Sequence, residues 1–122
     1  MADWQPGKGD PQKVPYSQGI PQTLGALAHL TPMNDEERLE DVFRRHGDSI
    51  AAMLIEPIQG NCCAISARPE FVKLARALCD RHGVLLIIDE VKTGFRVARG
   101  GVQSLIGVRC ASAPRVCGMP PE

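Results

Sequence analysis

Five consecutive apolar residues, at positions 84–88, run directly into two carboxylates, Asp89 and Glu90. An apolar run of this length, without alternation of polar residues, predicts a strand buried on both faces, as in a parallel sheet. Open parallel sheets bind their ligands beyond the carboxyl ends of the strands. A buried strand that ends in two acids therefore predicts a functional edge of a sheet.

The same pattern occurs once more upstream. The apolar run at residues 50–55 predicts a second buried strand, which ends at Glu56 because Pro57 cannot continue a central strand. Asn61 follows after a short turn. The two predicted strands therefore bring Glu56 and Asn61 to the same edge of the sheet as Asp89.

Each predicted strand follows a segment with helical periodicity. In residues 34–47, apolar residues at helical spacing form one narrow stripe, and Asn34 is the expected N-cap. In residues 68–83, Pro69 suits the first turn and Gly83 ends the helix. The order helix, strand, helix, strand predicts an α/β fold with a mainly parallel sheet and flanking helices.

Composition divides the chain into three parts. Residues 1–33 are rich in proline and glycine and predict a loop segment, residues 34–108 hold the α/β elements, and residues 109–122 match neither pattern. The 14 basic and 14 acidic residues balance, so the charge shows no bias toward nucleic acid. The apolar runs are too short for a membrane span, and the N-terminus lacks the apolar core of a secretion signal.

The chain has 5 cysteines without a C-x-x-C pair. An odd number of cysteines in a chain without a secretion signal predicts reduced thiols in a cytoplasmic protein. The cysteines and histidines do not have the spacing of a zinc site, so we expect no metal centre.

The residues alone leave several interpretations of Asp89 open. Its carboxylate can hold a protonated heterocycle or a metal, or it can be a helix cap or a surface group. Alternation along the strand places Asp89 and Val91 on one side and Glu90 and Lys92 on the other, so we expect Lys92 to face away from Asp89. Apolar residues followed by Asp-Glu are also typical of a Walker B strand, although the sequence has no phosphate loop G-x-x-x-x-G-K-[ST].

The segments IAAMLIEPIQGN and VLLIIDEVKTGFRVARGG, in this order, resemble class III aminotransferases of the pyridoxal-phosphate fold type I superfamily, and within them the glutamate-1-semialdehyde aminomutase branch. The resemblance implies that residues 34–108 are part of the large domain of such an enzyme. It implies amino-group transfer with pyridoxal 5'-phosphate as cofactor. It also implies an amino-acid or amino-aldehyde substrate and a homodimer.

The resemblance assigns roles to the residues at the strand ends. Asp89 would pair with the pyridine nitrogen of the cofactor and keep it protonated, so that the ring can accept electrons. Val91 would pack against one face of the ring, and Asn61 would lie near its phenolic oxygen. Residues 93–96 would form a turn that closes the site and meets a neighbouring subunit, while Glu56 would give structural support.

The chain departs from the family at the lysine that forms the Schiff base. The position that the resemblance assigns to this lysine holds Cys117, and no lysine follows Lys92. We therefore expect no catalytic lysine and no activity from the chain alone. Two alternatives stay open: a non-catalytic remnant that docks onto a full-length homologue, and an ATPase fragment built on the Walker B-like strand.

Overall fold

The computed structural model describes residues 10–109 except 12 and 16. They fall into two compact units, with the boundary between Pro32 and Met33. In the first unit, α1 (Gln22–Gly25) is a single helical turn, and the other described residues are turns and irregular chain. The predicted tail at residues 109–122 lies outside the described residues, apart from Arg109.

The second unit contains the predicted α/β elements. Their order is α2 (Glu36–His46), a 3-10 turn (Gly47–Ser49), β1 (Ala52–Ile55), β2 (Ile58–Gln59), β3 (Ile65–Ser66), α3 (Pro69–His82), β4 (Leu85–Ile88) and α4 (Gly101–Ile106). Strands β1 and β4 pair in parallel, with Ala52 opposite Leu85 and Ile55 opposite Ile88. The α/β prediction is therefore confirmed, whereas the β2–β3 hairpin and α4 were not expected from the sequence.

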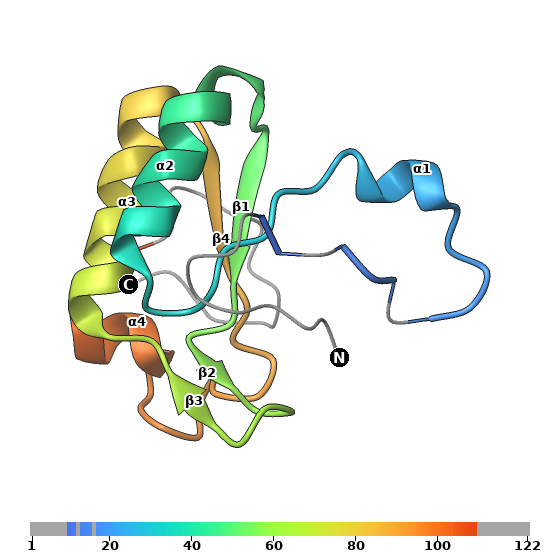
Figure 1. Cartoon of the computed structure of the whole chain (residues 1–122). Coiled ribbons are helices and arrows are strands. Elements are labelled where there is room, and N and C mark those ends of the chain that lie inside the picture. The colour runs from blue at the N-terminus through green and yellow to red at the C-terminus, as the bar shows by residue number, and fades with distance from the viewer. Residues whose placement is uncertain (1–9, 12, 16, 110–122) are drawn as a thin grey trace. The chain divides into compact units, whose positions relative to one another are not determined.

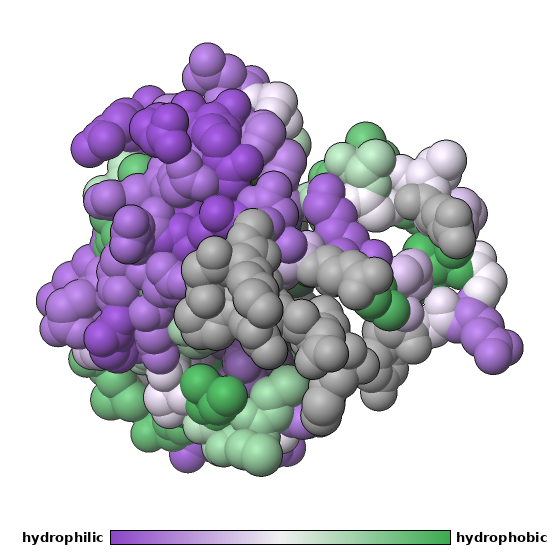
Figure 2. All heavy atoms as spheres, in the orientation of Figure 1, coloured by the Kyte–Doolittle hydropathy of each residue, from purple (hydrophilic) through white to green (hydrophobic). Residues whose placement is uncertain are grey.

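Helices α2 and α3 run side by side along one face of the β1–β4 pair (Figure 1). Their apolar stripes meet the strand residues of that face in one core. Its members are Leu39, Phe43, Ile55, Phe71, Val72, Ala75, Leu78, Cys79, Val84, Leu86, Ile88 and Val108. Full burial of a large apolar side chain contributes roughly 1.5–3 kcal/mol, so this core is the main source of stability. The outer surface of α2 is hydrophilic, as Figure 2 shows.

Within the second unit, none of the described helices covers the opposite face of the β1–β4 pair, which we call the open face. Leu54 is 68% exposed and Leu85 is 36% exposed, while their neighbours Ile55 and Leu86 are buried against the helices. The prediction that both strands are buried on both faces is therefore wrong for this unit. Continuous apolar strands are typical of sheets with helices on both faces, and the described elements of the unit cover only one.

The start of α2 differs from the prediction by one residue. Asp35, not Asn34, is the N-cap, and its side chain accepts a hydrogen bond from the backbone N–H of Arg38 at 2.9 Å. Asn34 has a left-handed φ of 63° and donates instead to the carbonyl of Ser66 at 3.0 Å. It also accepts from the backbone N–H of Arg68 at 2.7 Å, so it ties the start of α2 to the start of α3.

The ends of α3 follow the sequence closely. Pro69 occupies the first turn, where its missing N–H costs no helical hydrogen bond. Gly83 ends the helix with a left-handed φ of 67°. This sharp stop lets Val84 lead directly into β4, which places Asp89 at the far, carboxyl end of the strand.

Candidate functional site

Asp89 lies immediately after β4. Its backbone N–H still donates to the carbonyl of Ile55 at 2.8 Å, so it prolongs the parallel ladder by one residue. Its Oδ1 accepts from the backbone N–H of Val91 at 2.9 Å, which is the geometry of an Asx turn. Among the described residues, Asp89 has no cationic partner. The half-buried carboxylate therefore keeps Oδ2 available for a donor from outside the chain.

Val91 lies beside Asp89 and is 63% exposed. Glu90, between Asp89 and Val91, is buried, so burial still alternates over residues 89–91 although the strand ends at Ile88. An exposed branched side chain next to a carboxylate offers an apolar surface on which a flat, protonated ring can lie. The turn predicted at residues 93–96 is present, and Phe95 in it is 58% exposed with a left-handed φ of 61°.

The third predicted site residue, Asn61, lies in the turn that follows β2. Glu56 Oε1 accepts from the backbone N–H of Gly60 at 3.0 Å and so shapes the turn that leads to Asn61. The ammonium of Lys92 donates to Oδ1 of Asn61. A Cβ atom on Gly60 would lie 3.1 Å from Nζ of Lys92, so the lysine crosses this glycine.

This contact adds a partner that the sequence did not predict for Lys92. The side chain is exposed and joins Asn61 to the segment that follows β4. The contact thereby joins the turn after β2 to the segment after β4. Because an ammonium group only donates, it binds the oxygen of the Asn61 amide and leaves Nδ2 free to donate to an anionic ligand oxygen.

Glu90 is the residue that sequence reasoning missed. It is 7% exposed. Its Oε2 accepts from Thr93 Oγ1 at 2.6 Å and from the backbone N–H of Val102 at 2.9 Å. Its Oε1 accepts from the backbone N–H and the side-chain amide of Gln103 at 3.1 and 3.4 Å. Two features of the sequence could have pointed to this role of Glu90. Thr93 follows three residues later, and the pair Gly100 and Gly101 precedes a short apolar segment.

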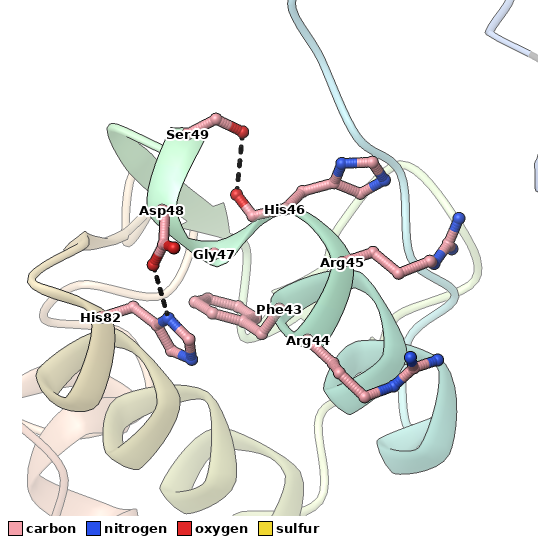
Figure 3. Close-up of a pocket in the computed structure, with 8 residues that line it drawn as sticks. All are labelled: Phe43, Arg44, Arg45, His46, Gly47, Asp48, Ser49 and His82. Atoms are coloured by element: carbon pink, nitrogen blue, oxygen red, sulfur yellow. Dashed lines mark hydrogen bonds and ion pairs between the residues drawn. The ribbon is translucent and has the colours of Figure 1, made fainter.

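A separate hollow lies at the other end of the second unit, at the C-terminal ends of α2 and α3 (Figure 3). It has a volume of about 270 Å³. The rings of Phe43 and His82 lie 5.6 Å apart, and Nδ1 of His82 is 3.7 Å from a carboxylate oxygen of Asp48. His82 lies three residues before the start of β4, so this hollow lies at the amino ends of the strands, opposite the edge that parallel sheets use for ligands.

The described cysteines are of two kinds. Cys79 is fully buried in the core, and burial raises the pKa of its thiol to about 11, which keeps it protonated and unreactive at neutral pH. Cys62 and Cys63 are exposed on the turn after Asn61. The described residues contain no cluster of three or more potential metal ligands. None of the helices in the described part is long and apolar enough to cross a membrane.

A comparison with known families supplies the deciding observation. The family described as Aminotransferase class-III matches residues 4–104 of the 122. The chain belongs to this class-III aminotransferase family. Both strand ends of the candidate site lie within the matched residues.

A curated relative and two solved structures give the same result. Glutamate-1-semialdehyde 2,1-aminomutase of Myxococcus xanthus is 43% identical over 96 residues, which is 79% of this chain and 22% of that protein. An omega-transaminase from Sphaerobacter thermophilus superimposes with a TM-score of 0.79 at 35% identity, over 86% of this chain and 24% of that chain.

The second structure is a transaminase with pyridoxal phosphate bound. It superimposes with a TM-score of 0.71 at 34% identity, over 77% of this chain and 22% of that chain. The class-III family and the α/β part of its fold are thus established. The chain spans about a fifth of the length of the curated relatives that it matches.

Proposed function

We propose that this chain carries one part of the cofactor site of a pyridoxal-phosphate-dependent class-III aminotransferase, of the glutamate-1-semialdehyde aminomutase type. The proposed reaction of the assembled enzyme is amino-group transfer, or transfer within one molecule, on an amino-acid or amino-aldehyde substrate. The observation that carries the proposal is the carboxylate of Asp89. It lies at the carboxyl end of β4 and has no cationic partner among the described residues.

The residues present fit the cofactor. Asp89 would hold a proton at the pyridine nitrogen, because a carboxylate stabilises a neighbouring cation. Val91 would pack on the ring with its exposed side chain, and Nδ2 of Asn61 would donate to the phenolic oxygen. When bound there, pyridoxal phosphate would supply an electron sink for breaking bonds at the amino-bearing carbon of the substrate.

The aminomutase assignment has two further supports. Asn61 stands where the resemblance gives many simple transaminases a glutamate, and the relative from Myxococcus xanthus, 43% identical, is a glutamate-1-semialdehyde 2,1-aminomutase. We propose a homodimer for the assembled enzyme, with the turn at residues 93–96 near the neighbouring subunit.

We further propose that the 122-residue chain alone does not catalyse transfer. Its four lysines are Lys8, Lys13, Lys73 and Lys92, and the position assigned to the Schiff-base lysine is Cys117, which lies outside the described residues. The purified chain, mixed with pyridoxal phosphate, an amino-acid donor and a keto-acid acceptor, should form no new amino acid. Turnover that depends on the chain would overturn this part of the proposal.

The site itself is best tested in a chimera. Residues 50–104 of this chain would replace the matching segment of the Myxococcus xanthus aminomutase. The chimera should keep the absorbance of bound cofactor and part of the aminomutase activity, whereas the same chimera with Asp89→Asn should lose most of both. An active Asp89→Asn chimera would remove Asp89 from the cofactor site. A matched control is Asp80→Asn, because Asp80 is an exposed residue of α3.

A second candidate function is docking onto a full-length homologue. The open face of the β1–β4 pair favours it, because Leu54 is 68% exposed on a sheet whose other face forms the core. The chain should then co-purify with a co-expressed full-length aminomutase, and Leu54→Lys should abolish this without unfolding the chain. Co-purification that is insensitive to Leu54→Lys would argue against docking through this face.

The geometry gives no support to an ATPase fragment. In a Walker B strand the glutamate polarises a water molecule. Here Glu90 is buried and its two oxygens accept from Thr93, Val102 and Gln103. We therefore expect no stabilisation of the chain by Mg²⁺-ATP in a thermal melt.

A further inference from the structure

We propose that Glu90 is a positioning residue: its buried carboxylate holds the segment of residues 91–100 closed and so fixes the orientation of Asp89 and Val91. The two acids that end β4 thus have different tasks. Asp89 faces outward with one hydrogen bond to its own turn, whereas Glu90 faces inward and binds residues up to 13 positions further along the chain. The consequence for the cofactor rests on the function proposed above, but the consequence for the segment does not.

The hydrogen bonds of Glu90 close a loop. Thr93 lies inside the segment, and Val102 and Gln103 lie in the first turn of α4, just beyond it. One carboxylate therefore joins the start of the segment to its far end. The backbone carbonyl of Glu90 adds a further bond, from the N–H of Gly94 at 2.7 Å.

Because Glu90 is buried, its carboxylate depends on these hydrogen bonds. A buried carboxylate is costly unless hydrogen bonds replace the lost water, and no described residue gives Glu90 an ion pair. If the segment opened, the carboxylate would lose the four donors that replace water around it. The closed segment is therefore the state in which Glu90 is satisfied.

Two glycines, Gly94 and Gly101, approach Glu90 closely. A Cβ atom on Gly101 would lie 2.5 Å from both carboxylate oxygens of Glu90. A Cβ atom on Gly94 would lie 2.9 Å from the backbone carbonyl oxygen of Glu90. The backbone approaches Glu90 at both positions more closely than any residue with a side chain would allow, as expected for a segment built to wrap the carboxylate.

Of the proposed cofactor-site residues, Val91 begins the closed segment and Asp89 lies just before it. Asp89 and Val91 flank Glu90 directly, and the hydrogen bond from Val91 N–H to Asp89 Oδ1 sets the carboxylate orientation. Lys92, which contacts Asn61, is the next residue. Release of Glu90 would let this turn sample other conformations, and a loosely held carboxylate binds a ligand less well than a preorganised one.

The test compares the complete chain with three variants: Glu90→Gln, Thr93→Val and the control Glu70→Gln, a glutamate exposed in the first turn of α3. Thr93→Val removes one donor while it keeps the size of the side chain, so it serves even if a change at Glu90 prevents folding. Amide hydrogen exchange is followed at Val91, Val102 and Gln103. Trypsin cleavage is followed after Arg96 and Arg99, both exposed in the segment.

We expect Glu90→Gln and Thr93→Val to raise the exchange of these amides and the cleavage rate by about tenfold, the effect of losing one buried hydrogen bond. The exchange of core amides such as Leu86 should stay unchanged, as should all rates in Glu70→Gln. Unchanged exchange at Val91 in both segment variants would overturn the proposal. A uniform rise at every amide, core included, would also overturn it, because Glu90 would then only stabilise the whole fold.

A second readout concerns the cofactor. Pyridoxal phosphate is titrated into each chain and followed by its absorbance. If the wild-type chain binds it, Glu90→Gln should weaken binding by about tenfold, and equal binding would overturn the positioning role. If the wild-type chain binds none, the proposed cofactor site fails for the isolated chain, while the exchange at Val91 still decides the role of Glu90.

Discussion

The segments that follow β1 and β4 are held in different ways. Each begins where an apolar strand ends near a glutamate. After β4, Glu90 is buried and binds three residues of the following chain. After β1, Glu56 is only partly buried and accepts from one backbone N–H, that of Gly60, and residues 60–66 are all exposed.

This difference means that the residues of the proposed site lie on segments of different rigidity. Asp89 and Val91 lie on the firmly held segment and Asn61 on the weakly held one, with Lys92 as the link. A rigid carboxylate suits the group that must hold a charge in one place, because preorganised charges stabilise a ligand without reorganisation. A strand-end glutamate can thus be an anchor or a simple turn former, depending on how deeply it is buried.

The largest effect should come from Gly101→Ala. Both Gly101 and Gly107 have left-handed φ, +67° and +68°, but only at Gly101 would a Cβ atom meet the Glu90 carboxylate, at 2.5 Å. Left-handed backbone costs an alanine about 1–2 kcal/mol, and overpacking adds about 1–3 kcal/mol. In urea unfolding, Gly101→Ala should therefore lower the free energy of unfolding by about 2 kcal/mol more than the control Gly107→Ala does. Equal losses would mean that Glu90 is not firmly held.

Asp89→Asn should have the next largest effect, on ligand binding and not on stability. The asparagine oxygen can still accept from the N–H of Val91, so unfolding should change by less than about 0.5 kcal/mol. Loss of a charge-assisted hydrogen bond should weaken pyridoxal-phosphate binding by roughly tenfold or more in the aminomutase chimera. The measurement is a titration followed by cofactor absorbance, and an unchanged affinity would contradict the assignment.

Lys92→Met should remove the contact with Asn61 that joins the two segments, with only a small loss of stability. The lysine is exposed, so its bond to Asn61 should contribute at most about 1 kcal/mol. The clearer readout is the side-chain amide signal of Asn61 in a proton–nitrogen spectrum, which should shift and broaden, while the amides of Val102 and Gln103 stay in place. A shift at Val102 would show that the link also supports the Glu90 anchor.

Glu56→Gln should have the smallest effect. The glutamine keeps an oxygen that can accept from Gly60, and the site is partly exposed, so the change in unfolding free energy should stay within about 0.5 kcal/mol. Amide exchange at Gly60 gives the local measurement. A rise in exchange at Gly60 as large as the one expected at Val91 in Glu90→Gln would remove the contrast between the two strand ends.

The sequence by itself determined the main elements of the second unit. Apolar runs without alternation gave β1 and β4, and Pro69 with Gly83 set the ends of α3, because these signals act through the local backbone. The parallel pairing followed from the order of the elements, since only a crossover helix can join such strands. Asp89 could also be placed from the sequence, because it directly follows a strand.

Only the tertiary structure decided which polar groups meet. The engagement of Asn34 by residues near α3, which leaves Asp35 as N-cap, the contact of Lys92 with Asn61 and the burial of Glu90 depend on residues 12 to 34 positions apart, whose approach no local pattern encodes. The open face of the sheet was likewise decided by packing. An apolar strand sequence shows that both faces can be buried, but it does not show which helices of this chain cover them.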